Sequence, residues 1–279
     1  MKLLKGRKIA EKILKETARE IKKKKSKPGL AVILVGKDKA SEIYVKLKKE
    51  KSEKIGIDFH LFRFKESDPE KKILEKIIEL NGNQKIDGII IQLPLPEKFH
   101  TQKLINAISL KKDVDGFHPK SVDLFFKNKE IFFPVFPQAI FSLVKSAGKN
   151  IKNRKAIIIA NSKLFGEMMV KTLSREKVQA AYIFKKDLKI NLGKIKRADI
   201  VITAVGSPGI VKGDMVKNGV IVVDGGISKK GSKVSGDADA DSFRNISGFL
   251  SPVPGGAGPV TVACLLKNVS ESFKNRSAK

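Results

Sequence analysis

Tyr44 and Lys48 lie four residues apart in the stretch SEIYVKLKKEK, and with Ser41 they follow i, i+3, i+7 spacing. On a helix this spacing places the three side chains in one stripe. Ile43 and Leu47 would form the neighbouring apolar stripe, which puts Lys48 at the rim of the buried face. A lysine amine partly withdrawn from water has a lowered pKa and can serve as an acid or base. Most helical lysines are solvated, so the spacing makes a chemical role for Lys48 possible without establishing it.

A second group of polar side chains begins with Gln92 in the stretch DGIIIQLPLP and continues with two aspartates further along the chain. Gln92 is expected at the carboxyl end of a strand, where open α/β sheets place ligand-binding groups. A satisfied structural glutamine is the alternative. Asp113 and Asp115 in KKDVDGF would face the same side of an extended segment, and one carboxylate could accept paired hydrogen bonds from an amino-heterocycle. Each aspartate could equally be an ordinary turn or helix cap.

Two loops have the composition of ligand-binding loops. In SPVPGGAGPVT, prolines fix the backbone while glycines allow it to approach a ligand, and the loop leads into a helix start that attracts anions. It could also be a simple interdomain turn. The stretch IIIANSKLFGE joins a strand to a helix where a dinucleotide-binding fold places its phosphate loop. It lacks the G-x-G-x-x-G glycines, so an ordinary turn is the alternative there.

The elements that must position these residues alternate between helix and strand. Helical periodicity over residues 6–25 and 39–55, and a helix opened by Ser67-Asp68-Pro69, are separated by the strands GLAVILVG, DFHLFRF and DGIIIQLPLP. A second series contains the strands KAIIIAN, QAAYIF, DIVITAVG and GVIVVDGG with the helix FGEMMVKTLSRE, and a last helix ends near Phe273. The pattern predicts an α/β protein with two doubly wound, parallel domains.

Composition narrows the class of protein further. The 279 residues carry 57 basic and 29 acidic side chains, a formal charge of +28 that favours anionic partners. The lysines are spread along the chain, whereas a nucleic-acid binder gathers basic residues on one face. The one cysteine, Cys264, allows no intramolecular disulfide and reads as a small buried hydrophobe. No apolar run reaches membrane-spanning length, so we expect a cytoplasmic protein without a membrane contact or a metal site.

Taken in order, SEIYVKLKKEKSEKIGI, DGIIIQLPLP, KDVDGFHP, GVIVVDGGI and SPVPGGAGPVTVACLLKN resemble the bifunctional methylenetetrahydrofolate dehydrogenase/methenyltetrahydrofolate cyclohydrolase family. The resemblance covers nearly the whole chain. It implies a catalytic folate-binding domain of residues 1–118 plus 257–279, whose C-terminal helix returns to it. It also implies a Rossmann-type NAD(P)-binding domain of residues 119–256, with the folate held between the two. A homodimer through the Rossmann domain is implied as well.

The resemblance also implies an activity in one-carbon metabolism and purine biosynthesis. A hydride leaves 5,10-methylenetetrahydrofolate for NADP, with NAD possible, and water opens the methenyl product to 10-formyltetrahydrofolate. Lys48 would be the catalytic lysine, Tyr44 would stack on the folate, Gln92 would orient the lysine and Asp115 would hold the pterin amino group. The further residues implied to bind substrate are Ser41, Leu93, Pro252, Val253, Pro254, Gly255, Gly256 and Pro259.

The departures from the family pattern lie on the cofactor side. The residues that we expect there are Ala160, Asn161, Ser162, Gly166, Lys185, Lys186, Gly206 and Ile227. Asn161 stands where the family has the arginine that pairs with the NADP 2′-phosphate. Three further stretches differ from the family. The family has Val-Gly-Pro where this chain has Phe165-Gly166-Glu167, and it has Pro-Cys-Thr-Pro-x-Gly where this chain has FPVFPQA. The family's usual Cys-His-Ser-x-Thr segment is missing from YIFKKDLK.

Three variants of the function therefore stay open. NADP could bind through Lys185 or Lys186, NAD could be preferred, or the dehydrogenase could be lost while the cyclohydrolase remains. The competing class is a non-catalytic basic protein that binds nucleic acid through its charge, with steeply salt-dependent affinity and no folate turnover. Specific nucleic-acid binding is not expected, because such a binder does not need Tyr44, Lys48 and Gln92 in this arrangement.

Overall fold

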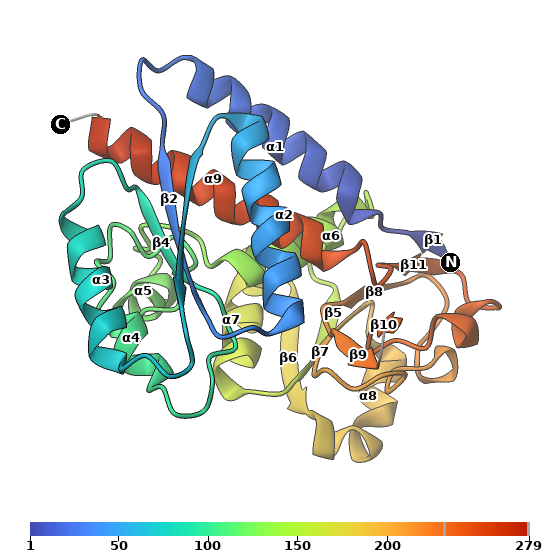
Figure 1. Ribbon diagram of the computed structural model, residues 1–279. Helices are drawn as coiled ribbons and strands as arrows, with labels where there is room; N and C mark the ends of the chain where they lie inside the picture. The colour runs from blue at the N-terminus through green and yellow to red at the C-terminus, as the bar shows by residue number, and fades with distance from the viewer. Residues whose placement is uncertain (231–232, 278–279) are drawn as a thin grey trace. The chain divides into compact units, whose positions relative to one another are not determined.

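The computed structural model describes residues 1–230 and 233–277, which divide into two units of discontinuous sequence (Figure 1). One unit joins Glu11–Val135 to Val262–Lys279 and contains Lys48, so we call it the lysine unit. The other joins Met1–Ala10 to Phe136–Thr261 and is called the six-stranded unit after its sheet. The chain thus leaves the lysine unit after residue 135 and returns to it at residue 262.

The sheet of the lysine unit has three parallel strands in the order β3-β2-β4. Their bounds are β2 Gly29–Val35, β3 Asp58–Phe64 and β4 Gly88–Ile91. Every residue of β2 and β4 is buried, as is usual for parallel strands covered on both faces. Ile33 pairs with Ile91, so β2 and β4 bring the residues after them to the same edge of the sheet.

Most of the described helices that cover the lysine unit precede its return segment. They are α1 Gly6–Lys22, α2 Lys39–Ile55, α3 Glu70–Gly82, α4 Thr101–Asn106 and α5 Pro119–Phe126, and α9 Ala257–Ser277 forms most of the return segment. α2 has strong end signals: the Asp38 side chain accepts a hydrogen bond from the Ser41 amide at 2.7 Å, and Gly56 ends the helix with φ 88°. The Asp38 cap fixes where α2 begins, and the Gly56 cap fixes where it ends. Together they determine which residues of the helix face the sheet.

The larger sheet has the order β1-β11-β8-β7-β5-β6, and its neighbouring strands are parallel. Its strands are β1 Lys2–Leu3, β5 Lys155–Ala160, β6 Gln179–Phe184, β7 Ile200–Ala204, β8 Val220–Asp224 and β11 Gly248–Leu250. β5 lies between β6 and β7, so the chain reverses its direction across the sheet there. Such a reversal is where open α/β sheets bind ligands.

The remaining elements of the six-stranded unit are shorter. Its helices are α6 Val135–Ser146, α7 Lys163–Ser174 and α8 Leu192–Arg197, and its antiparallel hairpin is β9 Ser228–Lys230 with β10 Lys233–Ser235. Four 3₁₀ turns lie at Lys185–Asp187, Lys189–Asn191, Gly213–Met215 and Ala240–Phe243.

Each unit has its own apolar core. In the lysine unit, Ile33 of β2 and Ile91 of β4 pack with Ile73 of α3 in one buried cluster. In the six-stranded unit, Ile159 of β5 and Val222 of β8 belong to a separate cluster. Two cores agree with the two domains expected from the sequence.

The predicted parallel α/β architecture is confirmed, with differences at the element ends. β4 stops at Ile91, so Gln92 is the first residue after the strand, and α9 continues past Phe273 to Ser277. The short helices α4, α5 and α6 were not predicted, because each is too brief or too interrupted by proline to show a clear period. Among the described helices, none is both long and apolar enough to cross a membrane.

Candidate functional site

The predicted stripe of Ser41, Tyr44 and Lys48 is present on α2, but the predicted apolar stripe beside it is not. Ser41 is buried, and Tyr44 and Lys48 are partly buried. The expected apolar stripe was wrong in part, since the Ile43 side chain is 61% exposed and Val45 is buried instead. The cause is the register of the helix: Ser41 begins the packed face, and Ile43 is about 200° further around. Lys48 is therefore held by polar neighbours and not by an apolar rim.

Gln92 holds the amine of Lys48. Lys48 Nζ donates a hydrogen bond to Gln92 Oε1 at 2.8 Å. Gln92 is nearly buried, its backbone amide donates to the Ile33 carbonyl, and its side-chain nitrogen donates to the Leu93 carbonyl, both at 2.8 Å. With the backbone tied to β2 and the amide nitrogen occupied, the amide oxygen faces the lysine. The Ser41 hydroxyl lies 3.5 Å from the same Leu93 carbonyl oxygen.

The pKa of Lys48 and the pKa of Asp115 are both shifted by their surroundings. Burial lowers the pKa of Lys48, and the charge of Asp115 partly offsets this effect. Burial raises the pKa of Asp115 to about 6, although Lys48 opposes the shift and Asp113 adds to it. Among the described residues, no donor bonds to the Asp115 side chain. A carboxyl without donors and an amine with a lowered pKa are poised for ligand binding and proton transfer.

Asp113 has a different role from Asp115. Its buried carboxylate accepts hydrogen bonds from the Gly116 amide at 3.3 Å and the His118 amide at 3.0 Å. His118 in turn caps α5, since its Nδ1 accepts from the Lys120 amide at 3.0 Å. Asp113 is thus the turn-forming carboxylate that the sequence left as an alternative, and Asp115 is the one with a free side chain.

Tyr44 lies about one turn before Lys48 on the same side of α2. Burial raises the pKa of its hydroxyl, so the side chain stays neutral near neutral pH. Ser41, Lys48, Gln92 and Leu93 are joined by the hydrogen bonds above, and Asp115 is joined to Lys48 by charge. The structure therefore brings the main candidate residues of the lysine unit into one site.

The Pro-Gly loop lies in the six-stranded unit. Residues 252–256 follow Ser251, whose hydroxyl accepts a hydrogen bond from the Asp224 amide at 2.7 Å. A side chain on Gly6 would come within 1.9 Å of the Gly256 carbonyl oxygen, so the backbones of α1 and this loop are in close contact. Gly255 has φ 104°, and Pro259 lies in the first turn of α9. The predicted substrate contacts of Pro252, Val253, Pro254, Gly255, Gly256 and Pro259 stay predictions.

The cofactor candidates gather at the carboxyl ends of three strands. Ala160 of β5 pairs with Phe184 of β6 and Ala204 of β7, so the loops after these strands start level with one another. Asn161 and Ser162 follow β5, both exposed, and the Ser162 hydroxyl caps α7 by accepting from the Phe165 amide at 3.3 Å. The start of α7 thus offers amide groups to an anion.

Lys185 reaches across this end of the sheet. Its ammonium donates to the Ser207 hydroxyl at 2.7 Å, linking the segment after β6 to the loop after β7. Since β5 separates these two strands, the lysine side chain spans the end of β5. Lys186, beside it, is exposed. NAD-binding folds place an acidic residue for a free ribose hydroxyl near the end of the second strand, and the residues that follow β6 here are Lys185, Lys186 and then Asp187.

A buried aspartate that sequence reasoning missed shapes the same loop. Asp237 accepts from the Ser207 amide at 2.6 Å, the Val205 amide at 2.7 Å and the Thr203 hydroxyl at 2.8 Å. It holds Ser207 where Lys185 bonds to it. The only signal in the sequence was its position between two glycine-containing stretches, which does not identify a partner.

The other cofactor candidates serve backbone geometry. A side chain on Gly166 would meet the Tyr182 ring at 2.5 Å, so α7 packs closely on β6. Gly206 has φ 67° and lies near Ile227, whose side chain is 47% exposed. All of these positions belong to the six-stranded unit.

Two departures from the family pattern contact each other. The rings of Phe136 and Phe165 pack with centroids 5.3 Å apart, and Phe136 also lies against Gly225 after β8. One ring comes from α6 and the other from the first turn of α7. The two substitutions therefore form one aromatic pair beside the candidate cofactor loops.

Comparison with known proteins identifies the family of this chain. Residues 4–115 match the family model for the tetrahydrofolate dehydrogenase/cyclohydrolase catalytic domain, and residues 134–277 match its NAD(P)-binding domain. Bifunctional protein FolD of Pelagibacter ubique is 40% identical over 285 residues, covering 100% of each chain. That of Nautilia profundicola is 40% identical over 281 residues, covering 99% of this chain and 98% of its own.

Solved structures agree with these sequence matches. A bifunctional FolD from Campylobacter jejuni superposes with a TM-score of 0.93 at 36% identity, covering 99% of both chains. The Trypanosoma brucei FolD complexed with NADP and inhibitor gives a TM-score of 0.94 at 28% identity, covering 99% of this chain and 98% of that chain. A NAD-dependent 5,10-methylenetetrahydrofolate dehydrogenase from Saccharomyces cerevisiae shares the fold at 19% identity, with a TM-score of 0.80 and coverage of 98% of this chain and 97% of that chain.

Proposed function

The chain belongs to the tetrahydrofolate dehydrogenase/cyclohydrolase family, and we propose that it carries out both reactions of the family name. It oxidises 5,10-methylenetetrahydrofolate to 5,10-methenyltetrahydrofolate and hydrolyses this product to 10-formyltetrahydrofolate. The observation that carries the proposal is the hydrogen bond from Lys48 to Gln92, made by an amine whose pKa is lowered.

Lys48 supplies the proton transfers of the hydrolysis. Because its pKa is lowered, more of its side chain is in the amine form near neutral pH, where it can accept a proton. Water adds to the methenyl carbon and gives one proton to Lys48 as it does so. When the bond from that carbon to N5 breaks, the new hydroxyl group loses its proton and becomes the formyl oxygen. Of the two protons from water, one ends on N5 and the other, passed on by Lys48, is released to solvent, which balances the reaction. Gln92 keeps the amine oriented throughout.

Asp115 and Tyr44 bind the substrate in this proposal. The Asp115 carboxylate has no donor of its own among the described side chains, so it can accept paired hydrogen bonds from the amino group and ring nitrogen of a pterin. The Tyr44 ring is partly buried and can stack on a flat heterocycle. Ser41 and Leu93 lie beside the lysine through their shared hydrogen bond and complete the wall that we propose contacts the substrate.

The six-stranded unit has features that fit a nicotinamide dinucleotide. The capped start of α7 suits a pyrophosphate, and Lys185 with Lys186 at the end of β6 suits the 2′-phosphate of NADP. We therefore propose NADP in preference to NAD. When bound, the dinucleotide supplies the acceptor for the hydride that leaves the one-carbon bridge. Ala160, Asn161, Gly166, Gly206 and Ile227 are proposed to line the same site.

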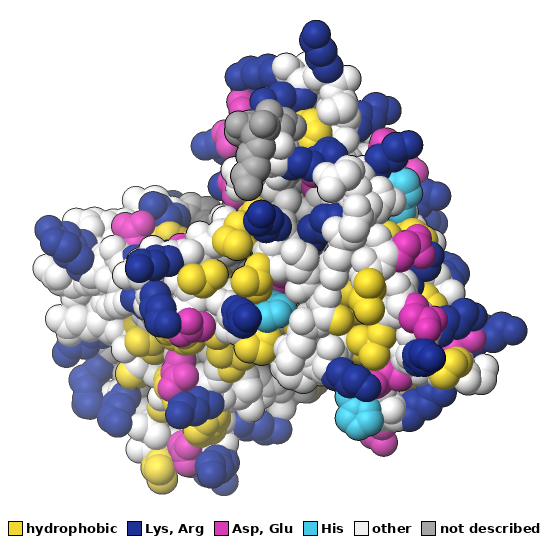
Figure 2. Space-filling model, turned by 90° about the vertical axis from the view of Figure 1, so that its left-hand side faces the viewer, with side chains coloured by type: hydrophobic (Ala, Val, Ile, Leu, Met, Phe, Trp, Pro, Cys, Tyr) yellow, Lys and Arg dark blue, Asp and Glu magenta, His cyan; other side chains and the backbone are white. Residues whose placement is uncertain are grey.

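The nucleic-acid alternative is not favoured by the charge distribution. Figure 2 shows Lys and Arg side chains scattered over the visible face, with Asp and Glu side chains between them. Among the described residues, several basic side chains form ion pairs with acidic ones four positions away in the sequence, such as Lys72 with Asp68 and Lys127 with Asp123. A surface that binds nucleic acid would gather unopposed basic side chains in one stripe.

Three wider expectations also stay proposals. The catalytic folate-binding domain is proposed as residues 1–118 plus 257–279, and the cofactor domain as residues 119–256. A cytoplasmic location and a homodimer through the cofactor domain are proposed on the resemblance to the family.

The first test is turnover by the purified protein. We expect reduction of NADP with 5,10-methylenetetrahydrofolate, slower reduction of NAD, and hydrolysis of methenyltetrahydrofolate above the uncatalysed rate. Hydrolysis without reduction of either nucleotide would mean that the dehydrogenase is lost.

Lys48→Met is expected to remove both activities, with hydrolysis falling on the order of 10²–10⁴-fold. Lys46→Met is the matched control, because Lys46 is an exposed lysine on the same helix two residues away. Both variants should keep the wild-type circular dichroism spectrum. Normal turnover by Lys48→Met would refute the assignment of the catalytic lysine.

A further inference from the structure

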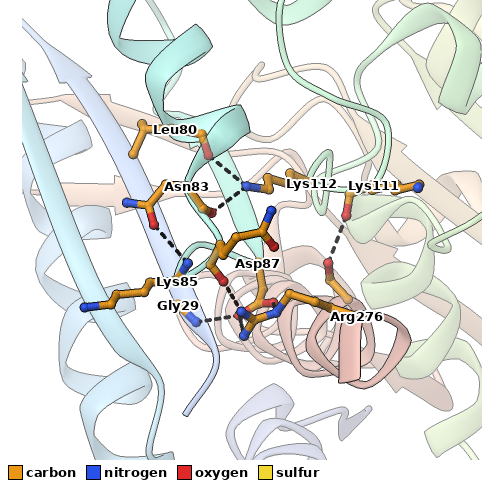
Figure 3. A network of polar contacts seen from close by, with 10 residues as sticks. Gly29, Leu80, Asn83, Lys85, Asp87, Lys111, Lys112 and Arg276 are labelled. Atoms are coloured by element: carbon orange, nitrogen blue, oxygen red, sulfur yellow. Dashed lines mark hydrogen bonds and ion pairs between the residues drawn. The ribbon is translucent and has the colours of Figure 1, made fainter. Parts of the chain in front are cut away.

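Three polar side chains of α9 form a row, and two of them, Asn268 and Ser272, bond to the loop carrying Asp115. Asn268, Ser272 and Arg276 are spaced four residues apart, so they lie along one side of the helix. Figure 3 shows the far end of this row, where Arg276 pairs with Asp87. One turn earlier, the Ser272 hydroxyl donates to the Lys111 carbonyl at 2.8 Å. All five of these residues belong to the lysine unit.

Asn268 is at the near end of the row, beside Asp115. Its side-chain nitrogen donates to the Val114 carbonyl at 2.8 Å and to the Phe133 carbonyl at 3.0 Å. Val114 directly precedes Asp115. Phe133 lies two residues before Val135, whose backbone amide donates to the Asp115 carbonyl at 3.3 Å. The carbonyls on both sides of the Asp115 α-carbon are thus held, one of them by Asn268.

The rest of the loop is held by other groups. The Ile89 amide of β4 donates to the Lys112 carbonyl at 2.9 Å, and the Lys112 ammonium donates to the carbonyls of Leu80 and Asn83, each at 2.8 Å (Figure 3). Asp113 closes the other end of the turn through Gly116. Asn268 is therefore the side chain from outside the loop that fixes the peptide immediately before Asp115.

Burying Asn268 lowers the stability of the fold, and its packing does not explain why an asparagine is present there. The side chain has no exposed surface, and within residues 1–230 and 233–277 its Oδ1 has no hydrogen-bond partner. An unsatisfied buried acceptor destabilises a fold, and leucine of similar volume would fill the same space without it. The asparagine is better explained by what its nitrogen holds.

We propose that Asn268 is a positioning residue for Asp115, setting the direction of the carboxylate that recognises the pterin. This inference rests on the proposed function, because it assumes that Asp115 binds the folate. It adds a residue from α9 that does not itself contact the reacting atoms. The expected signature is weaker folate binding with little change in the turnover of bound substrate, since Lys48 and Gln92 are tied to β2 and α2.

The test is a double-mutant cycle on the binding of tetrahydrofolate, measured anaerobically by calorimetry. Asn268→Leu should raise the Kd about tenfold or more, the size expected when a charge-assisted contact is misaligned. It should leave the kcat of hydrolysis and the Kd for NADP within about twofold. In an Asp115→Asn background, Asn268→Leu should have no further effect on the Kd, because its target is already lost.

Ser272→Ala is the matched control, since it removes a donor from the same helix to the same loop four residues before Asp115. We expect its Kd within about twofold of wild type, because Lys112 is held independently. Additive effects of Asn268→Leu and Asp115→Asn would overturn the proposal, as would an equal loss of kcat. If Asn268→Leu does not fold, the same cycle with Asn268→Thr, which retains one donor, must still be non-additive. If the wild-type protein binds no folate, the proposed function fails first, and that result is distinct.

Discussion

Burial shifts the pKa of Lys48 and the pKa of Asp115 in opposite directions for a single reason, which is that both side chains lose water around their charged form. The result is an amine that releases its proton more readily than an exposed lysine, and a carboxyl that keeps its proton up to a pH of about 6. Their mutual attraction reduces both shifts without cancelling them. A site of this kind is sensitive to small changes of pH.

The first prediction concerns the effect of Asp115 on stability. A carboxyl whose pKa rises on folding contributes stability below its unfolded pKa and loses it as the pH rises through the folded value. For a shift from 3.8 to about 6, Asp115→Asn should stabilise the protein by up to about 3 kcal/mol at pH 8 and by little at pH 3.5. Denaturant unfolding at the two pH values measures this difference. Asp58→Asn, at an exposed position, should shift neither midpoint.

Activity should respond to the same carboxyl with the opposite sign. Since the ionised form accepts the hydrogen bonds of the pterin, kcat/KM for hydrolysis should fall as the pH drops below about 6. Asp115→Asn should lower kcat/KM and remove this acidic limb of the profile. A variant that keeps the limb would assign it to another group. Stability and function thus conflict at this residue, as is common at binding sites.

We also expect Lys185 to contact the 2′-phosphate of NADP in place of the family's arginine. Lys185→Gln should raise the Kd for NADP about tenfold or more and leave the Kd for NAD within about twofold, because only NADP carries the 2′-phosphate. Calorimetric titration of each nucleotide measures this without turnover. Lys189→Gln is the control, at an exposed lysine four residues away. An equal loss for both nucleotides would place Lys185 at the shared pyrophosphate instead.

At the residue scale, helix and strand periodicity placed Lys48 and Gln92 at element faces and ends, which made a chemical role possible. The resemblance to the family assigned that role, and the side chains that support the site were not predicted. The resemblance to the family singled out Asp115, but the residue pattern alone could not separate it from Asp113, because the difference lies in which carboxylate accepts the backbone amides of Gly116 and His118. Asn268 left no signal at all, since its partner Val114 is 154 residues away.

At the scale of elements, α7 depends on one glycine for its place on the sheet. Gly166→Ala should destabilise the six-stranded unit by about 1–3 kcal/mol, because the new methyl group would overlap the Tyr182 ring. This outcome opposes helix propensity, which favours alanine over glycine by up to about 1 kcal/mol. Thermal unfolding followed by circular dichroism measures the change.

Gly82→Ala is the control for this substitution, because Gly82 is also a helical glycine, the last residue of α3, and has open space around it. Gly82→Ala should raise the midpoint of thermal unfolding or leave it unchanged. Replacing Tyr182 by leucine in the Gly166→Ala protein should recover part of the loss. Equal effects of the two alanine substitutions would show that α7 can move away from β6 freely.

Helices and strands were predicted correctly where the pattern of apolar residues continued over a long stretch. α1, α2, β2, β5 and β8 follow continuous helical or apolar patterns and agree with the structure. The segment of residues 101–146 was left without elements, because its helices are short and proline interrupts them. β1 has only two residues, and its pairing with β11 depends on contacts between distant parts of the chain. Local patterns cannot supply such information.

At the scale of the whole molecule, the charge of +28 should act on encounter with substrate more than on chemistry. Folates carry carboxylates on their glutamate tail and are attracted by a positive field. We expect kcat/KM to fall as salt rises from about 0.01 M to 1 M, over which the Debye length shrinks from about 30 Å to 3 Å, with kcat unchanged. Turnover at several salt concentrations, with a neutral osmolyte as control, measures this. If kcat falls together with kcat/KM, salt is disrupting the active site itself and not only the encounter with substrate.

The return of the chain to the lysine unit at residue 262 sets an order in time as well as in space. Val114 is synthesised 154 residues before Asn268, which at about 5–20 residues per second is a delay of roughly 8–30 s. During that interval the nascent loop around Asp115 has no α9 to hold it. A growing chain therefore contains Lys48 and Gln92 early but gains the support for folate recognition late, so premature termination within α9 should yield protein that retains the lysine site and binds its substrate poorly.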